Sequence, residues 1–248
     1  MAAPYVVAAG AAAGAGSGNV TPGAPTCQAG DIIVVVAATW DFDPLTCTAT
    51  GDIVNNSGVS GFETIFTPAA SGDYSEHTVS AWAGRTTGGS PGTITVGSGE
   101  NTIVTRAFSI RGAPSSGAFL GTDFGATAGI LTSGSQRTDI TFSSLTTTLN
   151  EELVILVAAI SDNVVPNAWN DGDLTPDQSY SGSEGGGSDA AYAVLFGSLA
   201  AAGSIGSPEF TLPSAEWWDS IRFTIKAATA AASKVPVIDN AYRQRRAA

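Results

Sequence analysis

The feature that most constrains the fold is an unbroken apolar run, GDIIVVVAAT, at Gly30–Thr39. A second run of similar character, EELVILVAAI, lies at Glu151–Ile160. Val, Ile and Ala dominate both runs, an acidic residue lies at the start of each, and turn-forming residues flank them, which favours strands over buried helices. Neither run alternates apolar with polar residues. We therefore expect both faces of each strand to be covered, one by the domain core and the other by an arm or a neighbouring subunit.

The similarity between the two runs continues downstream. The first run is followed by TVSAWAG (Thr78–Gly84), GTITV (Gly92–Val96) and NTIVTRAFSIRGA (Asn101–Ala113). The second is followed by AYAVLFG (Ala191–Gly197), PEFTL (Pro208–Leu212) and EWWDSIRFTIKAA (Glu216–Ala228). Shifts of 121, 113, 116 and 115 positions align the four segments in order. This order predicts two approximately repeated strand sets, at about 30–113 and 151–228, with insertions in loops. Chance similarity between β-rich segments is the alternative.

These patterns predict an all-β protein, specifically an antiparallel β-sandwich with a jelly-roll-like strand order. Residues 30–228 would form the sandwich. Residues 1–29 are rich in Ala and Gly and are expected to be a flexible arm, although Tyr5–Val7 could add one strand. Residues 229–248 are expected to be a flexible basic tail.

Glycine-rich turns in the first half predict an antiparallel meander of His77–Arg85, Thr93–Val96 and Thr102–Arg111. In its third strand, Val104, Arg106, Phe108 and Ile110 share one face. We expect Arg106 at the rim of the sandwich with its guanidinium in water, and a buried ion pair is the alternative. In the second half, the polar stretch Asn163–Asp189 is expected to be a long loop.

The two cysteines, Cys27 and Cys47, flank the first apolar run. If the chain turns back through Asp41–Leu45, Cys47 lies opposite about Ala38 and far from Cys27. A disulfide would then require the preceding segment to fold back. We expect two unpaired thiols, which fit folding in a reducing cytosol, and a disulfide is the alternative.

Charge is scarce and unevenly distributed. Charged residues make up 13% of the chain, against roughly 25% in average proteins. The chain up to Ala228 carries a net charge of −15, whereas the last 20 residues carry +3. The acidic body would be repelled by phosphates, so nucleic acid is not expected as a partner. No apolar run is long enough to span a bilayer, and the apolar start of the chain has no preceding Lys or Arg, so neither a membrane partner nor a secretory signal is expected.

No familiar catalytic or metal-binding motif is present in the sequence. His77 is the only histidine, which argues against a Ser/His/Asp triad, and there are too few Cys and His residues for a zinc site. The carboxylates of Asp41, Asp43, Asp171, Asp173 and Asp177 suit calcium or glycoside hydrolysis, but turn chemistry alone explains them. We therefore expect no enzymatic activity, cofactor or metal. Trp169 and Tyr180 are the best candidates for stacking on a sugar, with local packing as the alternative.

Four stretches together resemble a loose group of phage virion and phage-like proteins: GDIIVVVAATW, AWAGRTTGGSPGTITV, VTRAFSIRGA and NEELVILVAAISD. Typical members share a Gly-Asp-led apolar strand, an aromatic strand before a Gly-rich turn, a strand ending in Arg/Tyr-Gly, and an Asn/Glu-led apolar strand. The similarity covers about Ala29–Ala228. It implies a structural virion component built on a jelly-roll-like or related sandwich, with no catalytic residues to carry over.

The sequence therefore predicts a structural component of a tailed-phage virion, made in the host cytoplasm. The leading expectation is a head decoration or cement protein that binds the outer surface of the capsid. The alternative is a tail or fibre adhesin that binds host-surface glycan through Trp169 and Tyr180. Expected partners are phage capsid or tail proteins and further copies of the chain, with a trimer as the leading oligomer. Contact with a partner is expected from the tail residues Lys234, Arg243, Arg245 and Arg246.

Overall fold

The structure is a computed structural model of the chain. It describes residues 3–40, 45–66, 77–97, 102–121, 131–143, 145–147, 150–170, 172–185, 189–206 and 208–228. These residues form an all-β, antiparallel fold, as predicted, and contain no helix.

The strands of the first half are β1 (Tyr5–Ala9), β2 (Ala13–Ala15), β3 (Ile32–Trp40), β4 (Thr46–Ala49), β5 (Ile53–Val54), β6 (Glu63–Phe66), β7 (His77–Thr86), β8 (Ile94–Gly97) and β9 (Ile103–Arg111). Those of the second half are β10 (Leu131–Thr132), β11 (Arg137–Thr141), β12 (Leu153–Ser161), β13 (Ala168–Asn170), β14 (Thr175–Glu184), β15 (Ala190–Ser198), β16 (Glu209–Glu216) and β17 (Trp218–Ile225).

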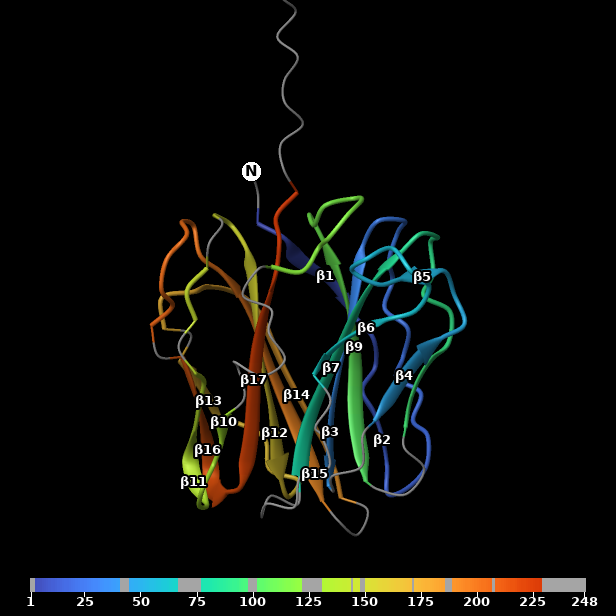
Figure 1. Cartoon of the computed structure of the whole chain (residues 1–248). Helices are drawn as coiled ribbons and strands as arrows, with labels where there is room; N and C mark the ends of the chain where they lie inside the picture. The colour runs from blue at the N-terminus through green and yellow to red at the C-terminus, as the bar shows by residue number, and fades with distance from the viewer. Residues whose placement is uncertain are drawn as a thin grey trace, which may run out of the picture.

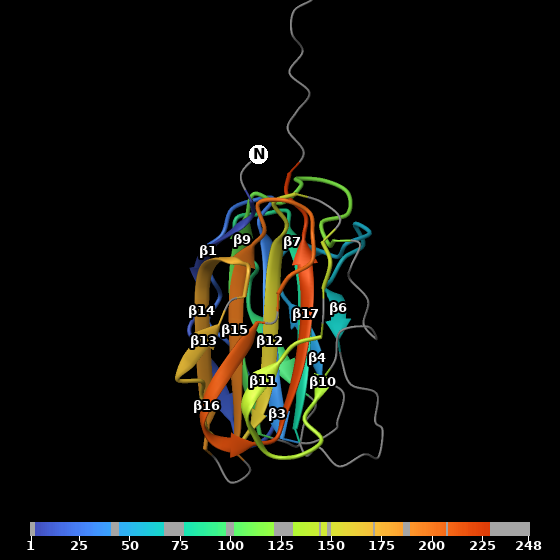
Figure 2. The same ribbon diagram turned by 90° about the vertical axis from the view of Figure 1, so that its left-hand side faces the viewer.

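The strands assemble into four sheets, which lie side by side as layers in Figure 1. Inner sheet 1 has the order β1-β9-β3-β7-β5, with β2 also on β9 and β6 also on β7. Inner sheet 2 has the order β10-β17-β12-β15-β14. Outer sheet 1 is β4-β8, and outer sheet 2 is β11-β16-β13. Figure 2 views the molecule from the side on which outer sheet 2 covers inner sheet 2.

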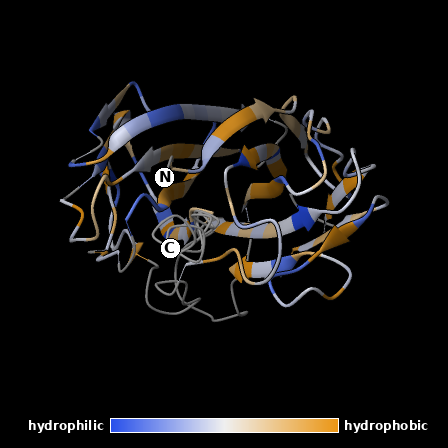
Figure 3. Ribbon diagram, turned by 90° about the horizontal axis from the view of Figure 1, so that it is seen from above, coloured by the Kyte–Doolittle hydropathy of each residue, from blue (hydrophilic) through white to orange (hydrophobic). Residues whose placement is uncertain are grey.

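Three hydrophobic cores separate the four layers. The central core lies between the two inner sheets and includes Val34 and Val36 of β3 and Leu153 and Ile155 of β12. One flanking core joins inner sheet 2 to outer sheet 2, and the other joins inner sheet 1 to outer sheet 1. Figure 3 shows the layers from above, with hydrophobic residues (orange) on the inner strands. The central strands therefore contribute to a core on each of their faces.

Double coverage explains the unbroken apolar runs. In β3 all residues but Trp40 are buried, and in β12 every residue is buried. The prediction that both faces are covered is confirmed, but the source of the cover differs from the expected arm or neighbouring subunit. The chain's own outer sheets supply most of it, because β4, β8, β11, β13 and β16 leave the inner sheets and pack on their outer faces.

The segment expected to be a flexible arm contributes two strands to inner sheet 1, and Val20 beyond them bridges to Val96 of outer sheet 1. β1 and β2 pair antiparallel with β9, which confirms a strand at Tyr5–Val7. Val6 is buried in the central core, and its backbone N–H donates to Asp177 Oδ2 of β14 at 2.6 Å. The composition suggested an arm because small residues bury little area each. In the structure, backbone hydrogen bonds to β9 hold β1 and β2 in place.

Two predicted strand pairings are wrong for one reason. The return strand expected opposite β3 is β4, which pairs with β8 instead, so that Cys47 lies opposite Val96. The expected meander is also absent, because β3 lies between β7 and β9 and the intervening β8 belongs to outer sheet 1. Short glycine-containing connections let the chain cross between layers, and the sequence does not show which layer a short apolar strand will join.

The stretch Asn163–Asp189, expected to be a loop, contains β13 and the ten-residue strand β14. β14 pairs with β15 along most of its length and lies at the edge of inner sheet 2. Its sequence, TPDQSYSGSE, contains no aliphatic residue, because most of its side chains are exposed or half-buried. An edge strand with this composition is difficult to distinguish from a loop by pattern alone.

The two inner sheets have matching pairings. β3 lies between β9 and β7, and β12 lies between β17 and β15. Val34 pairs with Phe108 and Ala83. Its counterpart Ile155 pairs with Phe223 and Phe196. The shifts of 121, 115 and 113 positions that align the segments in sequence thus also align their registers, and the repeat of strand sets stays a prediction.

The jelly-roll-like order is not confirmed. Each of the two facing inner sheets is built from one half of the chain, and within a half the chain alternates between an inner and an outer sheet. What the structure establishes is a layered antiparallel β-sandwich. Over the described residues, no helix is long and apolar enough to cross a bilayer.

Candidate functional site

The basic residues expected to contact a partner, Lys234, Arg243, Arg245 and Arg246, lie outside the described residues. The last described residue, Ala228, donates its backbone N–H to the Gly112 carbonyl at 2.7 Å. A Cβ at Gly112 would lie 3.1 Å from the Pro4 Cα, so residues near both ends of the described chain pack on Gly112. They meet at one pole of the molecule, the top of Figure 1.

Trp169 packs locally. It lies in β13, directly opposite Phe210 of β16, and the two ring centroids are 4.4 Å apart. The half-buried indole packs against the core between outer sheet 2 and inner sheet 2. Contact with Phe210 therefore accounts for Trp169 without a ligand.

Tyr180 belongs to a different core. It lies in β14, and its ring centroid is 5.1 Å from that of Phe108 and 6.3 Å from that of Phe196, within the central core. Its hydroxyl donates a hydrogen bond to Gln178 Oε1. Because Trp169 and Tyr180 pack in separate cores, the structure does not bring them together as a platform for one sugar.

Arg106 meets neither of the two expectations for it. Its guanidinium carbon lies 4.6 Å from the ring centroid of Tyr180 and 5.9 Å from that of Phe108, and its Nε donates to the Gly10 carbonyl at 2.8 Å. The half-buried cation thus rests on aromatic faces, which offset part of the lost hydration. Burial raises the pKa of both Tyr180 and Tyr192, and the charge of Arg106 partly offsets each rise.

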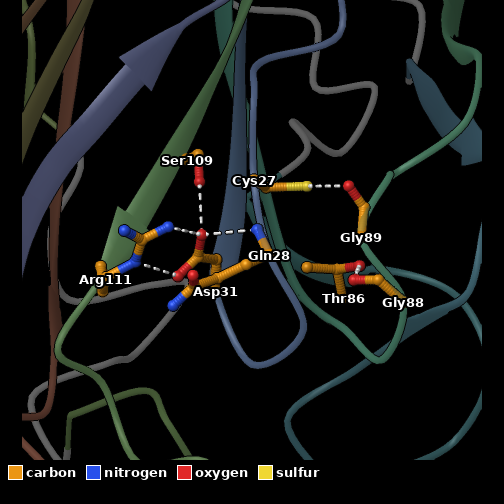
Figure 4. Close-up of polar contacts among 8 residues, drawn as sticks. All are labelled: Cys27, Gln28, Asp31, Thr86, Gly88, Gly89, Ser109 and Arg111. Atoms are coloured by element: carbon orange, nitrogen blue, oxygen red, sulfur yellow. Dashed lines mark hydrogen bonds and ion pairs between the residues drawn. The ribbon is translucent and has the colours of Figure 1, made fainter.

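A dense polar cluster surrounds Asp31 at the start of β3 (Figure 4). Arg111 donates through Nε to Oδ1 at 3.0 Å and through Nη2 to Oδ2 at 2.9 Å. Oδ2 also accepts from the Gln28 backbone at 2.9 Å and from Ser109 Oγ at 3.3 Å. Asp31 is only 2% exposed, and its hydrogen bonds raise the pKa of Arg111. The carboxylate is fully engaged with the protein, which indicates a structural role.

Both cysteines are free thiols, as expected, and both pack against the core between inner sheet 1 and outer sheet 1. The Cys27 thiol donates to the Gly89 carbonyl at 3.6 Å (Figure 4). Burial raises the pKa of both thiols, most strongly that of Cys47. Raised pKa values disfavour the reactive thiolate, so these cysteines are not suited to nucleophilic chemistry.

Arg85 binds the segment that connects the two halves. It is 6% exposed, and its Nη2 donates to the carbonyls of Pro114 at 2.9 Å and Gly117 at 2.7 Å. Its guanidinium carbon lies 5.2 Å from the ring centroid of Phe119, and burial lowers its pKa. Asn56 Oδ1 accepts hydrogen bonds from the next backbone N–H groups, those of Phe119 and Leu120. The connection is thus bound to the first half before it enters the second.

Asp219 is a buried carboxyl with a strongly raised pKa. It lies in β17, is 7% exposed, and its Oδ1 has no hydrogen-bond partner among them. Burial raises its pKa from 3.8 to about 7, and a hydrogen bond with Thr132 opposes the rise. A perturbed pKa alone does not make it a catalytic acid.

Among the candidate calcium or glycosidase carboxylates, Asp41, Asp43 and Asp171 lie outside the described residues. Gly172 donates its N–H to Asn170 Oδ1 at 3.1 Å and adopts a φ of 63°, a conformation that favours glycine. Asp177, a further calcium candidate, is bound to the backbone of Val6. Across the described ranges, no group of three or more His, Cys, Asp or Glu side chains is arranged to hold a metal ion.

The sequence did not single out Arg85 or Asp219. Both follow the period-two pattern of the inward-facing residues on their strands, Ala81 and Ala83 in β7 and Ile221 and Phe223 in β17. Counting that period to the strand ends would have placed both charged side chains on the inner face.

Comparison with known proteins gives no identification: no protein family, no curated protein and no solved structure matches the chain.

Proposed function

We propose that this protein is a structural component of a tailed-phage virion, and specifically a head decoration protein that binds the outer surface of the capsid. The observation that carries the proposal is the place where the chain leaves its described body, directly before the basic residues. Residues 229–248 hold a net charge of +3 and follow Ala228, which lies at the pole where residues 3 and 4 also lie. The chain thus leaves the acidic body at this pole, and its concentrated positive charge follows in the sequence.

The chemistry of arginine suits attachment to a protein surface. Arg243, Arg245 and Arg246 can each form bidentate, partly desolvated pairs with carboxylates of a neighbouring subunit. Each contact would be weak, but many copies on a symmetric shell would bind strongly through multivalency. The body supports such a role because its apolar side chains are used internally: Tyr5 and Val59 are the only large hydrophobic residues exposed among those described.

The competing proposal, a glycan-binding adhesin, loses its main support. Its two aromatic candidates, Trp169 and Tyr180, are each engaged by phenylalanine rings in different cores. A glycan array probed with the isolated protein tests it directly. Binding that is lost on Trp169→Ala would favour the adhesin and contradict the decoration role.

Cosedimentation with purified phage particles tests the proposed attachment. Deleting Val235–Ala248 should leave the melting temperature nearly unchanged and weaken attachment, and high salt should weaken the attachment of the full chain because exposed ion pairs are screened. Two variants of Arg243, Arg245 and Arg246 sharpen the test. Replacement of all three by Gln should resemble the deletion, and replacement by Lys should restore part of the binding because only the bidentate geometry is lost. A truncated chain that melts many degrees lower and still binds normally would show that the tail belongs to the fold.

A further inference from the structure

The correspondence between the two halves extends to segments that the sequence comparison did not include. In the first half, Val6 pairs with Ile110 and Gly14 with Val104. In the second half, Leu120 forms a bridge with Ile225, and Thr132 of β10 pairs with Asp219. The 115-position shift that relates β9 to β17 takes Ile110 to Ile225 and Val104 to Asp219, so the partners of these residues correspond as well. The N-terminal strands and the segment containing Leu120 and β10 therefore occupy equivalent places.

The outer sheets show the same equivalence. Ala49 of β4 pairs with Ile94 of β8, and Trp169 of β13 pairs with Phe210 of β16. The 116-position shift between β8 and β16 matches these pairs as well. Each half is therefore a complete unit, with its own edge strands, inner sheet and outer sheet, and the boundary between the units falls near residue 115.

The contact between the units has the pattern of a two-fold dimer interface. β3 of the first half faces β12, which is the equivalent strand of the second half. β7 packs on β12 and β17, and its counterpart β15 packs on β3 and β9. In an isologous interface, each contact of one element with a second is repeated with the two roles exchanged. The central core therefore lies about a pseudo-two-fold axis along the strands.

We propose that the molecule is a fused pair of one structural unit, and that the inner sheet of each half is a docking surface whose partner is the other half. This inference does not depend on the virion role. It assigns the central core to recognition between units, so contacts with other proteins would use the outer sheets, the sheet edges or the poles.

The docking surfaces are complementary rather than identical. At equivalent positions facing the central core, β7 carries Val79, Ala81 and Ala83, and β15 carries Tyr192, Val194 and Phe196. All six side chains are fully buried. Two copies of the first half would leave this space underfilled, whereas two copies of the second would overfill it, and either fault destabilises a core. The halves should therefore prefer each other to themselves.

Arg106 adds a polar element to this preference. Its cation rests on Tyr180, which belongs to the second half. The position equivalent to Tyr180 in the first half is in β6 near Phe66, since Phe66 pairs with Ala81 as Tyr180 pairs with Val194. The position equivalent to Arg106 in the second half is Ile221. Only a first half paired with a second half therefore places an arginine on a tyrosine ring.

Cutting the full-length chain between the units tests the proposal. A protease site inserted between Ser115 and Ser116, which are exposed, would yield fragments 1–115 and 116–248. After cleavage, separation in urea and remixing by dilution, the fragments should form an equimolar complex that melts like the cut parent, with no homodimers. The matched control carries the site between Ser57 and Gly58, an exposed turn inside the first unit, and its fragments should not recombine. Any of three outcomes would overturn the proposal. The 115/116 fragments fail to recombine although the uncut protein refolds, they recombine only as homodimers, or the control fragments recombine equally well.

A circular permutant avoids the risk that separated fragments aggregate. Residues 116–248 followed by residues 1–115 keep every residue, with the tail as the linker across the pole where Ala228 and Pro4 lie near Gly112. Its melting temperature should lie close to that of the parent. A permutant opened between Ser57 and Gly58 should melt clearly lower, and equal melting of the two permutants would overturn the proposed boundary.

Discussion

At the scale of single residues, the interior accommodates its charged groups in different ways. Asp31 accepts two hydrogen bonds from Arg111. Arg106 packs on aromatic rings, and Arg85 donates to backbone carbonyls. Among the described residues, the Asp219 carboxyl group hydrogen-bonds with Thr132, and its Oδ1 has no partner. Because a buried charge without a charged partner is costly, these sites should differ sharply in their effect on stability.

Replacing Asp31 by Ala should lower the free energy of unfolding by about 1.5–3 kcal/mol, because Arg111, Ser109 and the Gln28 backbone N–H lose their acceptor. The matched control is Asp139→Ala, which breaks a surface pair with Arg137 whose side chains are 29% and 52% exposed. That loss should stay within about 1 kcal/mol. Urea unfolding measures both, and equal losses would contradict the structural role of the Asp31 cluster.

Replacing Asp219 by Asn should change how stability depends on pH. The folded-state pKa of about 7 lies above the ordinary 3.8, so the folded state holds this proton more tightly than the unfolded state. The stabilisation from protonation is present below about pH 4 and is lost as pH rises through 7, by up to about 4 kcal/mol. Asn cannot ionise, so the variant should gain stability relative to the parent between pH 4 and pH 8.

Chemical unfolding of both proteins at pH 4, 6 and 8 measures that difference. Asp52→Asn, at an exposed position, serves as the control and should show a much smaller trend. A difference between Asp219→Asn and the parent that stays constant over this range would show that Asp219 is not buried as described.

At the scale of elements, the sequence predicted the long apolar strands that have a counterpart in each half. It did not predict the pairing of the short strands that cross between layers. Period and composition identified β3, β12, β9 and β17, because burial on one or both faces leaves a pattern in the residues themselves. The partners of β4 and β8 depend on which layer each short strand joins, and no local pattern records that choice. β14 was missed because an exposed edge strand needs no apolar period. The sequence also left the packing of Trp169 open, since its partner Phe210 lies far away in the sequence.

The doubly covered strand makes a strong prediction. Val34 is fully buried in the central core, so Val34→Asp should unfold the whole protein, because an unpaired buried charge costs several kcal/mol of the roughly 5–15 that stabilise a domain. Val59→Asp is the matched control, since Val59 is 62% exposed and should tolerate the charge. Far-ultraviolet circular dichroism and thermal melting distinguish the two, and a cooperatively folded Val34→Asp protein would contradict the assignment of the core.

At the scale of the whole molecule, four layers place the apolar surface inside and leave a low-charge exterior. The two inner sheets cover each other, and the outer sheets cover their remaining faces. We propose that such a body supplies a rigid surface to an assembly, and that the basic residues 229–248, which follow Ala228 in the sequence, attach it.

The central claim is that this body is part of a phage particle. Immunogold electron microscopy of purified particles of the phage that encodes the protein, labelled with an antibody against the four-layer body, tests it most directly. We predict gold distributed over the outer surface of the heads, with the label reduced on particles made with the Val235–Ala248 deletion. Particles that carry no label, from cultures in which the protein is abundant in the soluble fraction, would contradict the claim.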